Sequence, residues 1–261
     1  MRLNLYLVLI FLLLLFCFSC KTKQVGVKPD IVLKIQQTAG HNATSVVYNP
    51  DKKMYYAVFG GNESFPLEVF DEEGKTLRKT SVGFDARGLW WNSSTKQIEG
   101  NSFANHGIMA VQLTDKGFPN GVKTVINNND QPEDQSCGAF DQEKNEIIYL
   151  YKDTIYRYNR SSGKYIDKYG LSGISVKFNC INKTTVIYTG ILAKEIGLLD
   201  HENKKIYLFD KSSGNLTTSF DLPSNAPTFE IYRFAFANDH IWLYNKNKRA
   251  WYGYVISVRE H

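Results

Sequence analysis

The chain has 261 residues, of which 31 are Lys or Arg and 26 are Asp or Glu, so its formal net charge is +5. This excess is mild for the size, and no cluster of Lys and Arg rises above the background, which argues against a nucleic-acid-binding surface. Aromatic residues make up 14% of the chain, with 16 Tyr and 16 Phe, as is typical of proteins built from β-strands.

The N-terminus has the pattern of an export signal. An unbroken apolar run covers Leu5–Phe18, and Arg2 is the only charge before Lys21. A membrane-spanning helix needs roughly 20 apolar residues, so this run is too short to span a bilayer. It suits the central region of a signal peptide behind a small basic segment.

The apolar run ends in Cys17-Phe18-Ser19-Cys20, which resembles the lipobox of bacterial lipoproteins. Cys17 and Phe18 depart from the usual pattern, whereas the small Ser19 fits it. The resemblance implies a signal peptide over residues 1–19, lipid attachment at Cys20 and a short tether over residues 20–29. It also implies a bacterial cell-envelope location, on the outer membrane or facing the periplasm. An ordinary signal peptide and an uncleaved anchor helix are the alternatives.

Beyond the tether, two patterns recur in a fixed order. The first is an aromatic residue followed by Asn or Asp, a polar turn containing Lys and a new apolar run. Because Asn and Asp tolerate turn geometry, this pattern predicts a hairpin between the first and second strands of a unit. It occurs at Tyr48-Asn49, Trp91-Asn92, Phe140-Asp141, Phe178-Asn179 and, more loosely, Phe236-Ala237-Asn238.

The second pattern is a turn that ends in Gly, one strand later. It occurs at Gly74, Gly117, Gly163 and Gly214, at intervals of 43, 46 and 51 residues. Gly supplies the positive φ that such turns require. Repeats of about 40 to 50 residues are typical of propellers, and each unit is expected to contain four antiparallel strands.

Residues 30–261 are therefore predicted to form one all-β domain, a β-propeller of five four-stranded blades. The first blade is expected at Thr44–Tyr48, Met54–Phe59, Leu67–Phe70 and Leu77–Val82. The last unit has three strands, and Ile31–Ile35 is expected to close it as the fourth, which removes an exposed sheet edge. Six blades are the alternative, because 58 residues separate Phe178 from Phe236. An irregular β-sandwich is the other alternative.

The blade pattern, of which "IYLFDKSSGN" is a clear copy, is similar to the broad YVTN/NHL-like propeller superfamily found in many exported bacterial proteins. The resemblance extends over essentially the whole mature chain. It implies a fold and no particular activity.

Two cysteines lie within the propeller domain. Cys137 precedes Phe140 at the start of one predicted innermost strand, and Cys180 follows Phe178 at the end of the next. Their levels differ by five residues, or roughly 16 Å along a strand. A disulfide tolerates at most about 7 Å between Cα atoms, so we expect two free, buried thiols.

The default ligand site of a propeller is the face that gathers the loops running into the innermost strands and the loops joining second and third strands. The candidate ligand-face residues are His41, Asn42, Asn62, Glu63, Asp85, Arg87, Asn105, His106, Glu230 and Arg233. Asp130, Glu133 and Asp134 form an acidic loop that is a weak candidate for calcium, against the alternative of a solvated loop. No other cofactor is expected.

The leading functional hypothesis is a lipid-anchored binding or scaffold protein that uses the channel face for a protein, peptide or glycan ligand. The alternative is a small propeller hydrolase, glycosidase-like or lactonase-like, with carboxylates such as Glu63, Asp85 and Glu230 or a metal at the channel mouth. A structural role in an envelope complex is the third. The expected partners are a membrane, through the lipid anchor, and one such ligand, with no nucleic acid, and the protein is expected to be a monomer.

Overall fold

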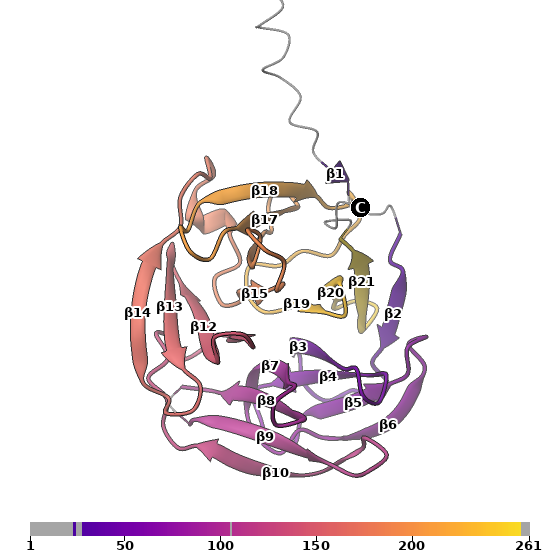
Figure 1. Ribbon diagram of the computed structural model, residues 1–261. Helices are drawn as coiled ribbons and strands as arrows, with labels where there is room; N and C mark the ends of the chain where they lie inside the picture. The colour runs from indigo at the N-terminus through magenta and orange to yellow at the C-terminus, as the bar shows by residue number, and fades with distance from the viewer. Residues whose placement is uncertain (1–22, 25–27, 105, 257–261) are drawn as a thin grey trace, which may run out of the picture.

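The computed structural model describes residues 23–24, 28–104 and 106–256, and it is a ring of five antiparallel four-stranded sheets (Figure 1). The predicted five-bladed β-propeller is confirmed. The predicted signal peptide over residues 1–19 and the predicted lipid attachment site Cys20 lie outside the described residues. No helix long and apolar enough to cross a membrane occurs in the described part of the chain.

In blades 1 to 4, the four blade strands run outward from the ring axis in chain order. Blade 1 consists of β3 (Asn42–Asn49), β4 (Met54–Gly60), β5 (Pro66–Phe70) and β6 (Thr76–Ser81). Blade 2 consists of β7 (Ala86–Asn92), β8 (Gln97–Ser102), β9 (Ile108–Leu113) and β10 (Pro119–Ile126). Blade 3 consists of β11 (Ala139–Asp141), β12 (Glu146–Tyr151), β13 (Thr154–Asn159) and β14 (Tyr165–Gly170).

The last two blades each pair with a strand from the N-terminal part of the chain. Blade 4 consists of β15 (Ile187–Tyr188), β16 (Ile196–Asp200), β17 (Lys205–Phe209) and β18 (Leu216–Asp221), and the short β1 (Lys23–Gln24) pairs in parallel with β18. Blade 5 consists of β19 (Phe234–Ala237), β20 (His240–Asn245), β21 (Ala250–Val255) and β2 (Ile31–Lys34).

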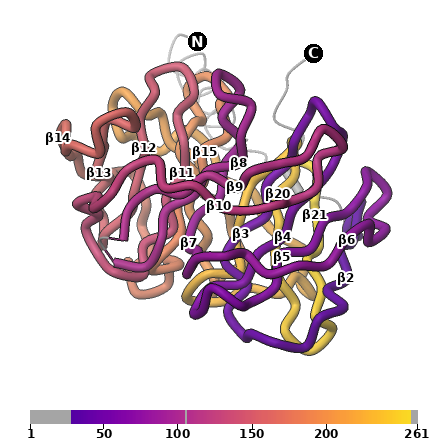
Figure 2. Tube along the Cα trace, turned by 90° about the horizontal axis from the view of Figure 1, so that it is seen from below, coloured from indigo at the N-terminus to yellow at the C-terminus, as the bar shows by residue number. Residues whose placement is uncertain are grey.

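The N-terminal strand closes the ring as predicted. β2 pairs antiparallel with β21, with Ile31 opposite Gly253 and Lys34 opposite Ala250. In Figure 1 and Figure 2, indigo β2 lies beside yellow β21. The outer edge of blade 5 is thereby built from the opposite end of the domain, so the two ends of the propeller share one sheet.

The hydrophobic core is divided into five clusters, one between each pair of neighbouring blades. Trp90 and Phe140 stack between blades 2 and 3, and Tyr55 meets Trp242 edge-on between blades 1 and 5. The ring is stabilised by these layers, since each Å² of buried apolar surface contributes about 25 cal/mol. None of the five clusters lies at the centre of the ring, which leaves room for a channel there.

The four Gly turns are confirmed. Gly74, Gly117, Gly163 and Gly214 each lie between the third and fourth strands of a blade, with φ between 68° and 83°. This left-handed conformation disfavours any side chain, which is why Gly recurs at this point of the repeat.

The prediction that Phe178-Asn179 ends the innermost strand of blade 4 was wrong. Phe178–Cys180 forms a short 3₁₀ helix, η1, in the long connection between blades 3 and 4, and the innermost strand of blade 4 is β15 at Ile187–Tyr188. Phe178 is partly buried against the cluster between these blades. At this position the aromatic–Asn pattern therefore lies in a packed connection and not at the end of a strand.

Because η1 replaces the predicted strand, one of the two cysteines is less buried than expected. Both thiols are free, as expected, and Cys137 is buried. Cys180 is only partly buried, because it lies in η1 and not in a central strand. Its thiol donates to Glu202 Oε2 at 3.1 Å.

Candidate ligand-binding channel

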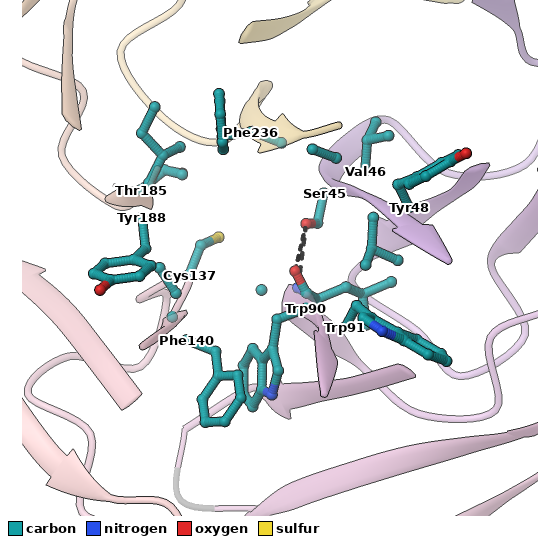
Figure 3. A pocket seen from close by; sticks show the side chains of 18 of the residues that line it. Ser45, Val46, Tyr48, Trp90, Trp91, Cys137, Phe140, Thr185, Tyr188 and Phe236 are labelled. Carbon is teal, nitrogen blue, oxygen red and sulfur yellow. Dashed lines mark hydrogen bonds between the residues drawn. The ribbon is translucent and has the colours of Figure 1, made fainter. Parts of the chain in front are cut away.

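A cavity of about 280 Å³ lies on the ring axis, and all five innermost strands line it (Figure 3). Each of these strands is the end strand of its sheet, so the backbone edge facing the axis has no neighbouring strand within the blade. Unpaired N–H and C=O groups of such an edge are available to water or a ligand. The cavity therefore combines backbone polar groups with the side chains of the same strands.

Two small side chains point into the middle of this cavity. Figure 3 shows the Cys137 sulfur and the Ser45 hydroxyl directed toward the open centre. Ser45 Oγ is hydrogen-bonded to blade 2, accepting from Leu89 N at 3.1 Å and donating to Leu89 O at 3.4 Å. Burial raises the pKa of the Cys137 thiol to about 12, so it is protonated at neutral pH and is a poor nucleophile.

Aromatic residues frame one end of the channel, one from each blade. This aromatic end is formed by Tyr48, Trp91, Phe140, Tyr188 and Phe236, each at or within one residue of the end of its innermost strand. The rings of Tyr48, Trp91, Phe140 and Tyr188 point away from the axis (Figure 3), so they surround the cavity without filling it. Four of these positions belong to the repeated aromatic–Asn pattern, whereas Tyr188 was missed because Thr189 follows it.

The opposite end of the channel is crossed by a polar bridge. Tyr232, from the loop before blade 5, donates its hydroxyl hydrogen to Gln135 Oε1, and Arg87 Nε donates to the same oxygen at 3.1 Å. Blade 5 lies across the ring from blades 2 and 3, so these contacts span the axis. We call Tyr232, Gln135 and Arg87 the polar bridge; none of the three lines the cavity.

Further contacts hold the polar bridge in place. Arg87 Nη1 donates to Asp85 Oδ1 at 2.5 Å, and its guanidinium lies 4.9 Å from the ring centre of Phe103 and 5.7 Å from that of Tyr232. The Tyr232 backbone N–H donates to Thr184 Oγ1 at 2.8 Å, which connects the bridge to the loop before blade 4. Burial raises the pKa of Tyr232 above its ordinary range, so its hydroxyl remains a donor.

A buried amide joins blades 2 and 3 beside the bridge. Asn101 is fully buried, and its Oδ1 accepts from Gly88 N at 2.9 Å and Gly138 N at 3.0 Å. Its Nδ2 donates to Ser136 O at 2.7 Å and to Gln131 Oε1 at 2.9 Å. The two glycines allow this approach, because a Cβ on Gly88 would lie 2.1 Å from Gly138 O.

Of the predicted ligand-face residues, the structure brings Asp85 and Arg87 together in one network. His41, Asn62, Glu63, His106 and Glu230 are exposed, Asn42 is half-buried at the start of β3, and Arg233 is buried. Asn105 lies outside the described residues. None of the nine described candidates lines the cavity. Tyr232 and Gln135 lie in loops expected on this face but were not among the candidate residues, because no repeated pattern marks them.

The three carboxylates considered for hydrolysis have separate partners or lie in solvent. Asp85 Oδ1 accepts from Gly61 N and from Arg87, both at 2.5 Å. Glu230 forms an ion pair of 2.6 Å with Lys183, which holds the pKa of its carboxyl below the usual value. The Glu63 side chain is exposed.

The acidic loop is held by hydrogen bonds within the loop and to Ala104. Glu133 Oε2 accepts from Gln135 N at 2.8 Å, and the Asp134 carbonyl accepts from Ala104 N at 3.0 Å. Asp130 and Asp134 are exposed. Over residues 23–24, 28–104 and 106–256, no group of three or more His, Cys, Asp or Glu side chains is arranged to hold a metal ion.

No family model and no curated protein matches this sequence. Solved structures resemble its fold. A glutaminyl cyclase from Myxococcus xanthus is 10% identical with a TM-score of 0.55, and the match covers 91% of this chain and 100% of that chain. A gluconolactonase from Xanthomonas campestris is 7% identical with a TM-score of 0.50, over 91% of this chain and 95% of that chain.

Raptor from Chaetomium thermophilum is 10% identical with a TM-score of 0.50, and the match covers 92% of this chain but 30% of the Raptor chain. At such low sequence identities, a shared fold does not indicate a shared activity. Together with the ring of five sheets, these similarities place the chain among the β-propellers.

Proposed function

We propose that this protein is a cell-envelope binding protein whose ligand site is the central channel, approached from the aromatic end. The observation that carries the proposal is the cavity of about 280 Å³ lined by all five innermost strands. Its volume is just below the usual range of roughly 300–1,000 Å³ for small-molecule sites. It suits a single sugar ring or one peptide side chain better than an extended ligand.

The chemistry of the wall supports a ligand with both polar and apolar surfaces. Unpaired strand edges supply backbone donors and acceptors, and the Ser45 hydroxyl adds a side-chain group. The part-exposed rings of Tyr48, Trp91, Tyr188 and Phe236 supply apolar edges at the mouth. Monosaccharides and peptide side chains with amide or hydroxyl groups have this mixed character.

A pair of matched cysteine substitutions tests the site. Cys137→Met extends a longer side chain into the open centre, whereas Cys180→Met adds the same group in η1, which does not line the cavity. Saturation-transfer NMR would measure binding of N-acetylglucosamine and of N-acetylated amino-acid amides. We expect saturable binding by at least one of these probes in the unmodified protein and in Cys180→Met, with at least a tenfold loss in Cys137→Met.

Two results would overturn this assignment. One is the absence of saturable binding for every probe in the unmodified protein. The other is equal affinity in Cys137→Met and Cys180→Met, which would place the bound probe outside the channel. Circular dichroism of both variants would confirm that the comparison is made between folded proteins.

We also propose that Cys20 attaches the protein to a membrane through acyl chains, as the lipobox resemblance implies. Three residues beyond Cys20, β1 pairs with the outer strand of blade 4, so the anchor would hold that edge of the propeller toward the membrane. Labelled palmitate supplied to bacteria expressing the full chain should appear in the unmodified protein and be absent from Cys20→Ala. Equal labelling of the two proteins would rule out Cys20 as the anchor.

The hydrolase alternative has no comparable observation in its favour. Asp85 is held by Arg87 and Glu230 by Lys183, and neither carboxylate lines the cavity. The similarity to the glutaminyl cyclase and the gluconolactonase concerns the fold and gives no evidence for an activity. The binding role is therefore the function that the geometry supports best.

A further inference from the structure

Arg233 is a buried cation at the end of the channel opposite the aromatic residues. It is 7% exposed and immediately precedes β19. Its guanidinium carbon lies 3.8 Å from the centre of the Phe229 ring, so one face of the guanidinium is covered. Burial lowers the pKa of Arg233 from its ordinary value, which indicates that its surroundings do not compensate the charge.

The guanidinium of Arg233 has no hydrogen-bond or ion-pair partner among the described residues. Its Nε is sealed from solvent without an acceptor, whereas the two Nη atoms are not sealed. The acid nearest in sequence, Glu230, is paired with Lys183 at 2.6 Å. Arg233 therefore presents free N–H donors at a largely desolvated position.

Arg249 provides an internal comparison in the same part of the molecule. Its guanidinium lies 5.1 Å from the centre of the Phe59 ring, and its Nη atoms donate to the carbonyls of Gly40, Ala39 and Gln37. These contacts fix the chain between β2 and β3. Arg249 thus has a structural role that its acceptors define, while Arg233 has the same kind of aromatic contact and no acceptors.

An unpaired charge removed from water is costly, and a guanidinium binds carboxylates and phosphates through two parallel hydrogen bonds. We infer that Arg233 is the centre of an oxyanion-binding site, with the Nη atoms as donors and Phe229 as the platform beneath the guanidinium. The ligand group is a carboxylate or a phosphate. The site lies at the other end of the ring from the aromatic residues and does not depend on the channel assignment.

The backbone around Arg233 is suited to holding the side chain in place. Tyr232 and Arg233 both have positive φ, 50° and 58°, and the Arg233 backbone is hydrogen-bonded to Ala43 O and Tyr244 N. Two successive residues in this strained region require support from their surroundings. The strained pair positions the Tyr232 ring in the polar bridge and fixes the Arg233 guanidinium beside Phe229.

Two substitutions of similar size separate an anion site from a packing role. Arg233→Met removes the charge and keeps an unbranched apolar side chain, and Arg249→Met does the same where the guanidinium has acceptors. Thermal unfolding would be followed in sodium chloride and, at matched ionic strength, in sodium phosphate or sodium acetate. Arginine Nε–Hε NMR would measure binding directly.

We expect the melting temperature of the unmodified protein to rise with phosphate or acetate, with a dissociation constant of about 1 mM for a single bidentate contact. The salt that acts at lower concentration identifies the ligand group as phosphate or carboxylate. Arg233→Met should lose the shift and be at least as stable as the unmodified protein in chloride. Arg249→Met should unfold at a lower temperature and keep the shift.

Either of two outcomes would overturn the inference. In the first, neither anion produces a saturable shift of the melting temperature or of the Arg233 Nε–Hε resonance. In the second, Arg233→Met retains the anion response. Because probe binding in the channel is measured with uncharged ligands, failure of one site leaves the other assignment intact.

Discussion

The two ends of the channel belong to the same five strands but differ in chemistry. At the aromatic end, each blade contributes one aromatic residue at the same point of its innermost strand. At the other end, the polar bridge joins Tyr232 and Gln135, which come from loops of different length and composition, to Arg87 at the start of β7. The repeat therefore determines one end of the channel, while the connections between blades determine most of the other.

The same contrast extends to the contacts between blades. On the side of the aromatic end, the turn after the third strand of one blade contacts the preceding blade: Arg160 pairs with Glu99, and Lys211 with Asp141 at 2.7 Å. On the side of the polar bridge, the contacts follow no such repeat. We therefore expect the aromatic end to contribute more to stability and the polar end to depend on individual hydrogen bonds.

The largest effect is expected for Glu99→Ala. Glu99 is fully buried and accepts hydrogen bonds from Arg160, from Trp90 Nε1 at 3.2 Å and from Asn92 Nδ2 at 3.1 Å. Removing it leaves the Arg160 guanidinium desolvated and unpaired, which should lower the free energy of unfolding by about 3–5 kcal/mol. Equilibrium denaturation in urea measures this loss.

The control for Glu99 is an exposed ion pair on the same protein. Lys96 and Asp51 lie 3.1 Å apart, with side chains 73% and 43% exposed. Asp51→Ala should change the free energy of unfolding by less than about 1 kcal/mol. A loss in Glu99→Ala no larger than that in Asp51→Ala would contradict the view that buried charges join the blades at this end.

A smaller effect is expected for Tyr232→Phe. The substitution removes one hydrogen bond to Gln135, whose Oε1 still accepts from Arg87. The free energy of unfolding should fall by about 1 kcal/mol. Tyr165→Phe is the control, since this ring is 48% exposed on β14 and should show almost no change.

Probe binding in Tyr232→Phe tests whether the two ends of the channel act independently. The polar bridge does not line the cavity, so the affinity of an uncharged channel probe should stay within twofold of that of the unmodified protein. A tenfold change would show that the bridge controls the cavity. The two ends would then form one site.

Much of the fold could be predicted from sequence because the blade pattern is local. The four strands of blade 1 lie within two residues of their predicted limits, and the Gly turns have the expected positive φ. The closing strand at Ile31–Ile35 could be predicted because a three-stranded last blade needs a fourth strand. The strand limits and the Gly turns depend mainly on residues that are close together in the sequence.

The candidate site was less predictable because it depends on contacts that no local pattern encodes. Phe178 has the same aromatic–Asn pattern as Tyr48, but it packs in a connection, and the central strand of blade 4 starts nine residues later. Tyr232 and Gln135 are 97 residues apart in the chain. Arg233 was included among the ligand-face residues, but its lack of an acceptor is visible only in three dimensions.

Ring closure by β2 has a consequence for the order of folding. Asp30 and Val255 are hydrogen-bonded although 225 positions separate them along the chain. Contacts of such large sequence separation slow folding, since most of the chain must be arranged before they can form. Of the strands that form the five blades, β2 is made first during synthesis and must wait for β21 before it has a partner. The outermost strand of the last blade is therefore the first of the twenty blade strands to be made and among the last to pair.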